Sequence, residues 1–307
     1  MERDEQLQWE RDNARWAAAA AFGAGVCTLA GTMVLLSALN PSPDNNVEGI
    51  ALVHEKSGQL LLASILQALG TALAAPPLYY LFRATRLRRP QLPVLLRYLV
   101  LIAPVAAGLL AVIHQIQLEG VADKLAPNFP ADIPEKGKAL TELKDMVNDE
   151  VGKGPLVAVS GFATAAGLGI AFAFLMVSLN AMRAGLLSRF MGIIGVIVGV
   201  LLVLPILPLP ILQIFWLGAI GLLFLGPWPQ GRGPAWETGE ADPWPTAQDR
   251  RDAMLGEDAP IRGGRDEADL EEIEDDEPVD VQPTGTPSRI REEPTHPRSK
   301  KRKRKRR

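Results

Sequence analysis

Six long apolar runs alternate with short polar stretches along the first 226 residues of the chain. The runs cover residues 16–39, 59–82, 93–117, 155–182, 186–204 and 209–226. None of them contains Asp or Glu, and their few arginines stand near one end of a run. A helix needs about 20 mostly apolar residues to cross the roughly 30 Å of hydrocarbon in a bilayer. The pattern predicts an all-α fold in which residues 16–226 form a polytopic bundle of six transmembrane helices.

Only a proline-rich stretch divides the last two runs. Its prolines are Pro205, Pro208 and Pro210. As one helix, residues 186–226 would be about 60 Å long, which is too long for a single crossing. Because proline disrupts a helix interior, we expect a tight hairpin that crosses twice, with a re-entrant hairpin as the alternative. For the same reason, Pro76, Pro77 and Pro104 can kink the second and third spans.

The basic residues between the runs predict an orientation. Three arginines lie in the leader 1–15, five in the connection 83–97 and two in the connection 183–189, and all three stretches fall on one side of the bundle. The other side carries Lys56 and, in the loop 118–154, five lysines among eight acidic residues. Basic residues in short loops favour the cytoplasm. We therefore expect both the N- and the C-terminus to be cytoplasmic.

The loop 118–154 is the one sizeable extracytoplasmic element that this topology leaves. Apolar residues recur in it on one helical face, at Leu140, Leu143, Met146, Val147 and Val151. This spacing predicts a short amphipathic helix that lies on the bundle or on the outer membrane surface.

Small residues recur at every fourth position in several runs. They are Gly161, Ala165, Gly169 and Ala173 in the fourth run, Gly195 and Gly199 in the fifth, and Ala17, Ala21 and Gly25 in the first. Such residues let helices approach closely in lipid. The sequence leaves open whether these faces meet within one bundle or between the copies of an oligomer.

Polar residues inside the runs are few. The only interior ionisable side chain is His114, and Gln67, Thr71 and Gln213 are the other polar candidates. Together they can line a cavity of a small transporter or channel, although water or hydrogen bonds between helices explain each of them as well. We find no combination of nucleophile, base and orienting group, no metal-ligand set and no cofactor motif, which argues against an enzyme.

Residues 227–307 are different in character. The segment 227–245 is rich in Pro and Gly and carries Trp228, Trp236 and Trp244. Because tryptophan favours the membrane interface, we expect this segment to lie along the inner membrane surface or against the base of the bundle. The stretch 246–297 is strongly acidic, and we expect it to be disordered because it has too little apolar surface to fold.

A polybasic terminus, residues 298–307, follows the acidic stretch. Its basic residues are Arg298, Lys300, Lys301, Arg302, Lys303, Arg304, Lys305, Arg306 and Arg307. Such a run can bind the phosphates of anionic lipid or of ribosomal or other RNA, or it can simply hold the C-terminus inside. A flexible tail of about 70 residues has a reach of roughly 45 Å. The leading hypothesis is a membrane anchor or scaffold with a polyanion-binding tail, and the alternative is a small transporter or channel.

Two stretches of the chain carry a resemblance. The first surrounds Arg183, Gly185, Leu186, Leu187, Ser188, Arg189, Gly192 and Gly195, and the second reads FWLGAIGLLFLGPWPQGRGPAWETGEADPWP. They resemble six-span membrane proteins of actinobacterial type that are grouped as a domain of unknown function. The resemblance covers residues 16–245 loosely, through motifs made mostly of Gly and Leu. It implies a location in a bacterial plasma membrane and no known activity.

Overall fold

The computed structural model describes residues 3–130, 133–204, 210–228 and 232–244. The chain divides into two compact units, Met1–Arg251 and Asp252–Arg307, and all described residues belong to the first. The acidic stretch 246–297 and the polybasic terminus 298–307 therefore lie outside the described residues.

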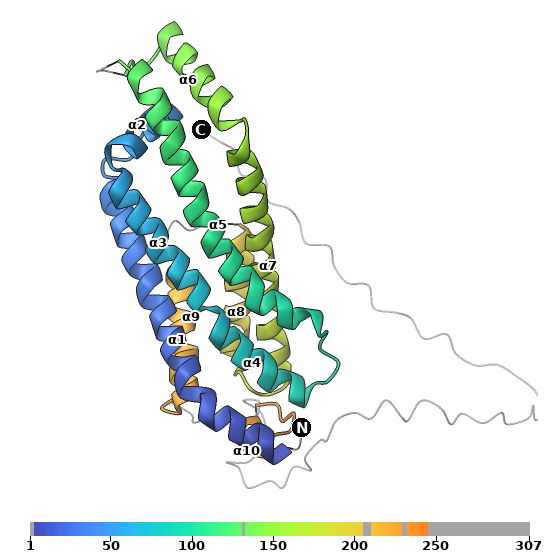
Figure 1. Ribbon diagram of the computed structural model, residues 1–307. Helices are drawn as coiled ribbons and strands as arrows, with labels where there is room; N and C mark the ends of the chain where they lie inside the picture. The colour runs from blue at the N-terminus through green and yellow to red at the C-terminus, as the bar shows by residue number, and fades with distance from the viewer. Residues whose placement is uncertain (1–2, 131–132, 205–209, 229–231, 245–307) are drawn as a thin grey trace, which may run out of the picture. The chain divides into compact units, whose positions relative to one another are not determined.

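Every regular element among the described residues is a helix, so the all-α prediction is confirmed for this part of the chain (Figure 1). The helices are α1 (Arg3–Ala38), α2 (Asn46–Glu55), α3 (Ser57–Leu73), α4 (Ala75–Arg88), α5 (Leu95–Leu125), the 3-10 helix η1 (Ala126–Asn128), α6 (Lys138–Val151), α7 (Pro155–Arg183), α8 (Arg189–Val203), α9 (Ile211–Leu225) and α10 (Ala235–Thr238).

Four helical segments are long and apolar enough to cross a membrane. They are Arg3–Ala38, Ser57–Arg88, Leu95–Asn128 and Pro155–Arg183. The last two predicted spans correspond to α8 and α9, which have 15 residues each and are shorter than the roughly 20 residues of a full crossing. Because of these long apolar helices, the fold is compatible with a membrane protein.

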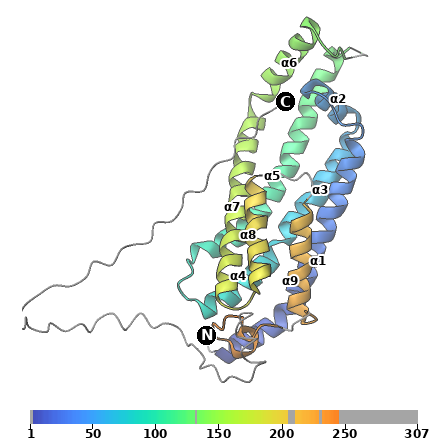
Figure 2. The same cartoon turned by 180° about the vertical axis from the view of Figure 1, so that it is seen from behind.

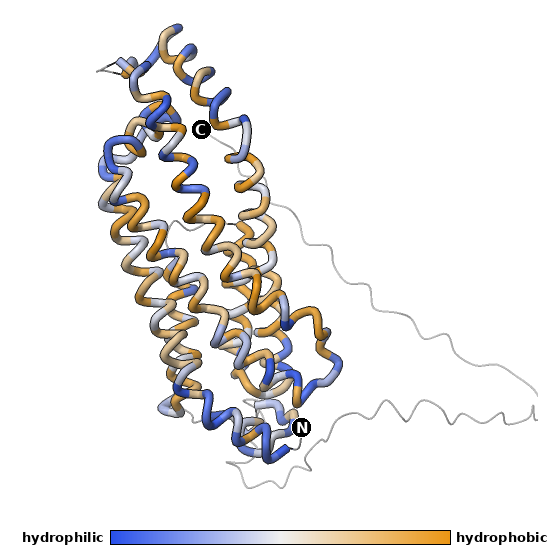
Figure 3. The backbone as a smooth tube through the Cα atoms, in the orientation of Figure 1, coloured by the Kyte–Doolittle hydropathy of each residue, from blue (hydrophilic) through white to orange (hydrophobic). Residues whose placement is uncertain are grey.

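The long helices run side by side and alternate in direction (Figures 1 and 2). Helix α3 packs between α1 and α5, and α5 packs against α7. Helix α8 packs against α7, and α9 packs against α1. The start of α1, the end of α4 and α10 lie together at one end of the bundle, which we call the basal end, whereas α2 and α6 lie at the opposite, distal end. Figure 3 shows mostly hydrophobic residues between two more hydrophilic ends.

The distal end has a hydrophobic core of its own. Residues of α2, the end of α5 and α6 meet there, and Leu140, Leu143 and Val147 are buried among them. The amphipathic helix predicted in the loop 118–154 is thus confirmed as α6, and it packs against α2 and α5. Its Met146 remains exposed. Helix α2 lies between the first two predicted spans and is capped by Asn45, whose side-chain oxygen accepts from the backbone N–H groups of the first helical turn.

Proline affects two of the long segments differently. The second predicted span breaks at Ala74, between α3 and α4, directly before Pro76 and Pro77. Helix α5, in contrast, continues through Pro104. The leader 1–15 is helical from Arg3 onward, as the first part of α1.

Most of the small-residue faces are used within the bundle. A methyl group added at Gly169 would lie 3.0 Å from the Cβ of Ala103 in α5. One added at Gly199 would lie 2.8 Å from the carbonyl oxygen of Ala171 in α7. Gly161 differs, because no heavy atom lies within 4 Å of such a group there. Close packing between helices of the same chain therefore accounts for these small-residue faces, except toward the distal end of α7.

Candidate functional site

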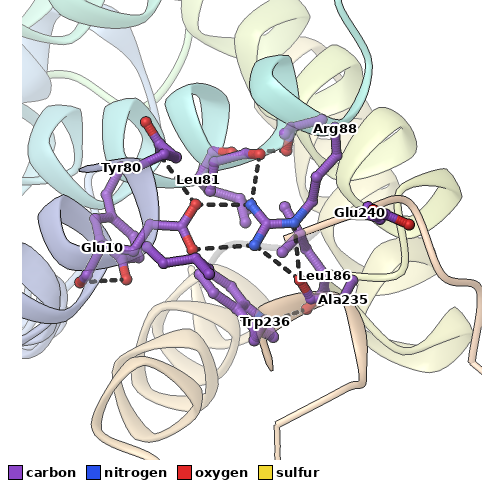
Figure 4. Close-up of polar contacts among 12 residues, drawn as sticks. Glu10, Tyr80, Leu81, Arg88, Leu186, Ala235, Trp236 and Glu240 are labelled. Atoms are coloured by element: carbon purple, nitrogen blue, oxygen red, sulfur yellow. Dashed lines mark hydrogen bonds and ion pairs between the residues drawn. The ribbon is translucent and has the colours of Figure 1, made fainter. Parts of the chain in front are cut away.

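A buried ion pair lies at the basal end of the bundle, between Glu10 of α1 and Arg88 of α4 (Figure 4). The exposed fractions of the two side chains are 4% and 0%. Arg88 Nη1 donates to Glu10 Oε1 at 2.7 Å, and Nη2 donates to Oε2 at 3.1 Å. This is the two-pronged geometry that suits a guanidinium and a carboxylate best.

Arg88 uses all five of its N–H groups. Besides the two bonds to Glu10, Nη1 donates to the carbonyl oxygen of Ala84 at 2.8 Å. Nε and Nη2 both donate to the carbonyl oxygen of Ala235, at 2.9 and 2.8 Å. On the other side of the pair, Gln6 donates to Glu10 Oε1 at 2.9 Å. Burial of two charges is costly unless hydrogen bonds satisfy them, and here the guanidinium is fully satisfied.

Aromatic rings surround the ion pair. Tyr80 stacks between Trp9 and Trp236, with ring centroids 5.5 and 5.8 Å away, and Phe224 meets it edge-on at 4.6 Å. The Tyr80 hydroxyl donates to the backbone carbonyl of Glu10 at 2.9 Å. These stacked rings exclude water from the charges, which strengthens their attraction.

The cluster holds the segment after α9 against the bundle. Trp236 is only 7% exposed, and its indole N–H donates to the Leu186 carbonyl at 2.9 Å. Ala235 beside it accepts both bonds from Arg88. We call Glu10, Tyr80, Arg88, Ala235 and Trp236 the basal clamp. It joins α1, α4 and α10, which lie far apart in the sequence.

Of the three predicted interface tryptophans, Trp236 packs against the base of the bundle, which is one of the two placements that the sequence left open. Trp228 and Trp244 are partly buried. Trp228 packs against the main core, and an added methyl group on Gly233 would lie 2.6 Å from Trp244 Nε1.

The polar residues predicted to line a cavity are spread along the bundle. The Ser64 hydroxyl of α3 donates to the carbonyl of Ala111 in α5 at 3.3 Å. His114 lies distal to this contact, and Gln67 lies basal to it. Since a helix rises 1.5 Å per residue, these two side chains start about 9 Å apart along the bundle.

The other two predicted cavity residues, Thr71 and Gln213, do not connect His114 with Gln67. The Thr71 hydroxyl donates to the carbonyl of Gln67 within α3, at 2.9 Å. Gln213 lies in the first turn of α9, which packs against α1 and α8. The four residues are therefore not gathered into one polar site in the part of the chain that the structure describes.

Sequence reasoning missed both charges of the basal clamp. The predicted topology placed Glu10 in the cytoplasmic leader 1–15 and Arg88 in the connection 83–97. The sequence does contain an indication that Glu10 is buried. The buried face of α1 continues toward the N-terminus at helical spacing, through Ala21, Ala17, Ala14, Glu10 and Gln6. For Arg88 the sequence offers no comparable signal, because its neighbours Arg86 and Arg89 are only partly buried.

The hydrogen bonds of the clamp join helices α1, α4 and α10 to one another. Its guanidinium has no spare donor for a substrate, and its carboxylate already accepts three bonds. No group of three or more His, Cys, Asp or Glu residues within residues 3–130, 133–204, 210–228 and 232–244 could hold a metal ion.

Comparison with known proteins gives no further identification. No family model matches the chain, and no curated protein or solved structure matches it. The resemblance to six-span actinobacterial proteins therefore stays a prediction.

Gly185 offers a test of how tightly the segment after α10 is held. Its φ of +78° favours glycine, and a methyl group there would collide with the carbonyl of Asp242. We expect Gly185→Ala to lower the melting temperature in detergent and to speed tryptic cleavage at Arg232. Gly154→Ala is the matched control, because Gly154 also has a positive φ, +69°, and nothing lies within 4 Å of its added methyl group. Equal behaviour of the two variants would show that this contact is not formed.

Proposed function

We propose that this protein is a multi-pass anchor or scaffold in a bacterial plasma membrane, whose polybasic terminus binds polyanions on the cytoplasmic side. Its six apolar helices, α1, α3–α4, α5, α7, α8 and α9, form the membrane body. Both ends of that body lie at the basal end, where the arginines of the connections 83–97 and 183–189 favour the cytoplasm. A spanning and a re-entrant α8–α9 hairpin both return the chain to this side.

The observation that carries the proposal is the basal clamp. It fixes Ala235 and Trp236 to the helices of the body through buried hydrogen bonds. The segment 232–244, which precedes the tail, is therefore attached to the body at a defined position. An anchor needs such a fixed attachment, so that whatever the tail binds stays beside the membrane. The clamp itself leaves no donor free for a ligand, which supports a structural role for the body.

The ligand chemistry follows from the charge of the terminus. Nine of its ten residues are Lys or Arg. Each phosphate contact releases counterions, so binding that uses 6–10 contacts weakens by about 10³–10⁵ between 50 and 200 mM salt. Anionic lipid and ribosomal RNA both supply the required phosphates.

Removal of residues 298–307 tests the proposal. The full chain and the truncated chain are reconstituted in nanodiscs of neutral lipid and mixed with phosphatidylglycerol vesicles or with ribosomes. We expect the full chain to float with the vesicles or to sediment with the ribosomes at 50 mM salt, and the truncated chain to do neither. The arm that responds identifies the source of the phosphate.

A chain in which the nine basic residues are replaced by Gln controls for the length of the tail. It should behave like the truncated chain, because charge rather than length is responsible. Association that is unchanged by both alterations, in both arms, would overturn the proposal.

A further inference from the structure

The hairpin of α8 and α9 rises from the basal end and stops well short of the distal end (Figure 2). Each of its helices has 15 residues, which corresponds to about 22 Å at 1.5 Å per residue. The hydrocarbon layer is about 30 Å thick. Neither helix is therefore long enough to cross it upright.

Contacts with the long helices show where the hairpin ends. On α8, an added methyl group at Gly199 would meet α7 at Ala171 and Leu175. Because α7 runs in the opposite direction, the last residue of α8 lies level with Leu168. Helix α7 begins at Pro155, so about 20 Å of it extend beyond the end of α8.

The contact between α9 and α1 also shows that the hairpin ends short of the distal end. An added methyl group at Gly25 would lie 3.7 Å from the side chain of Ile214. The first residue of α9 therefore lies level with Thr28. Helix α1 continues to Ala38, about 15 Å farther toward the distal end, and its apolar run extends over that whole distance.

The composition of the turn fits a position inside the membrane. The residues between α8 and α9, 204–210, are only Leu, Ile and Pro. The two distal connections, 40–58 and 118–154, are by contrast rich in charged and polar side chains. A connection that emerged into water beside them would have no physical reason to be wholly apolar.

We infer that α8 and α9 form a re-entrant hairpin, which enters the membrane from the basal side and does not emerge on the distal side. This inference rests on the membrane location proposed above. The chain then crosses the bilayer through α1, α3–α4, α5 and α7. The faces of α1 and α7 beyond the turn contact the acyl chains of the distal leaflet.

Re-entrant segments must still satisfy their backbone polar groups. Three of the seven residues 204–210 are prolines, which have no N–H to satisfy. The Pro210 carbonyl accepts from the N–H of Ile214 at 3.0 Å. Gln213, in the first turn of α9, places a polar amide at this depth. Apart from Trp216, it is the only side chain within 190–225 that carries nitrogen or oxygen.

The exposed surface of the two long helices agrees with lipid contact. Beyond the turn, Met33 of α1 is 54% exposed and Phe162 of α7 is 67% exposed. Both are large apolar side chains without a covering helix among the described residues. Exposure of this kind is costly in water and costs nothing against acyl chains.

Cysteine labelling tests the depth of the hairpin. Cys27, the only cysteine of the chain, is first replaced by Ala. Leu204→Cys then places a thiol at the end of α8, where the side chain is 54% exposed. In proteoliposomes, we expect a membrane-impermeant maleimide to label it at least tenfold more slowly than Ser42→Cys in the distal connection. After unfolding in SDS, both thiols should react alike.

Leu29→Cys is the depth-matched control, because Leu29 lies on α1 at about the level of the first residue of α9. If Leu204→Cys reacts as fast as Ser42→Cys while Leu29→Cys stays unreactive, the hairpin spans the membrane and the inference is wrong. If Leu29→Cys also reacts fast, the membrane location itself fails. Slow labelling of both Leu204→Cys and Leu29→Cys supports a re-entrant hairpin.

Discussion

Replacement of Arg88 by methionine is expected to lower the free energy of unfolding by about 3–5 kcal/mol, because it leaves a buried carboxylate without its counter-charge. The Arg88 side chain is fully buried, and it forms a two-pronged ion pair with Glu10. The carbonyl of Ala235 loses two donors at the same time. Titration with SDS in mixed micelles, followed by tryptophan fluorescence, measures the loss.

A second substitution distinguishes a stranded charge from simple loss of packing. Glu10→Gln added to Arg88→Met removes the uncompensated carboxylate, so the double variant should be more stable than Arg88→Met alone. It should still be less stable than the original protein, since the carbonyls of Ala84 and Ala235 remain without their donors. Equal stability of the single and double variants would mean that the pair is not buried as the structure has it.

Arg3→Met is the matched control for this experiment. Arg3 also links α1 to the segment after α10, through a 2.9 Å ion pair with Glu240, but both side chains are largely exposed. Surface pairs of this kind contribute at most about 1 kcal/mol. A loss as large as that of Arg88→Met would show that burial of the ion pair does not decide the effect.

Replacement of Trp236 by alanine is expected to be about as damaging, with a loss of about 3–5 kcal/mol. The indole ring stacks on Tyr80, and its N–H satisfies the carbonyl of Leu186. Trp236→Phe keeps an aromatic ring but removes the hydrogen bond and part of the ring system, so it should cost less than Trp236→Ala, about 1–3 kcal/mol. The same SDS titration ranks the two variants.

Limited proteolysis gives Trp236→Ala a local readout. Freed from the clamp, the segment around Arg232 should be cut by trypsin well before the helices unfold. Trp16→Ala controls for loss of a tryptophan as such, because Trp16 is 77% exposed on α1. Similar cleavage of the two variants would argue that Trp236 does not hold the segment in place.

The clamp variants also separate the body from the tail. Neither Arg88→Met nor Trp236→Ala removes any of the nine basic residues of 298–307. Vesicle or ribosome binding should therefore survive in both, while the stability of the body falls. The stability of the body and the binding of polyanions by the tail can therefore be lost independently of each other.

Much of the helical content was predictable because local composition decides it. Apolar runs without Asp or Glu fold as helices wherever backbone groups must pair internally, and α6 shows its apolar face at helical spacing. Helix α2 was missed although Asn45 and Glu48 form a capping pair. Its ten residues are too short to cross a bilayer, so the lengths of the apolar runs give no sign of this helix.

The lengths of α8 and α9 were only partly predictable. Hydropathy alone extends these runs to 19 and 18 residues, because it counts apolar residues whether or not they are helical. Both helices have 15 residues in the structure, since α8 ends at Val203 and α9 begins after Pro210. The hairpin's level along the bundle then depends on contacts such as that between Gly199 and Ala171.

The sequence by itself determined that this chain is a set of apolar helices with a charged tail, because composition and spacing act over a few neighbouring residues. Only the tertiary structure decided that Glu10 and Arg88 form a buried pair, since the same letters in a leader and a loop would ordinarily be solvated. Pairing across 78 positions depends on how α1, α4 and α10 meet. That meeting fixes Ala235 and Trp236 on the bundle, and no local pattern encodes it.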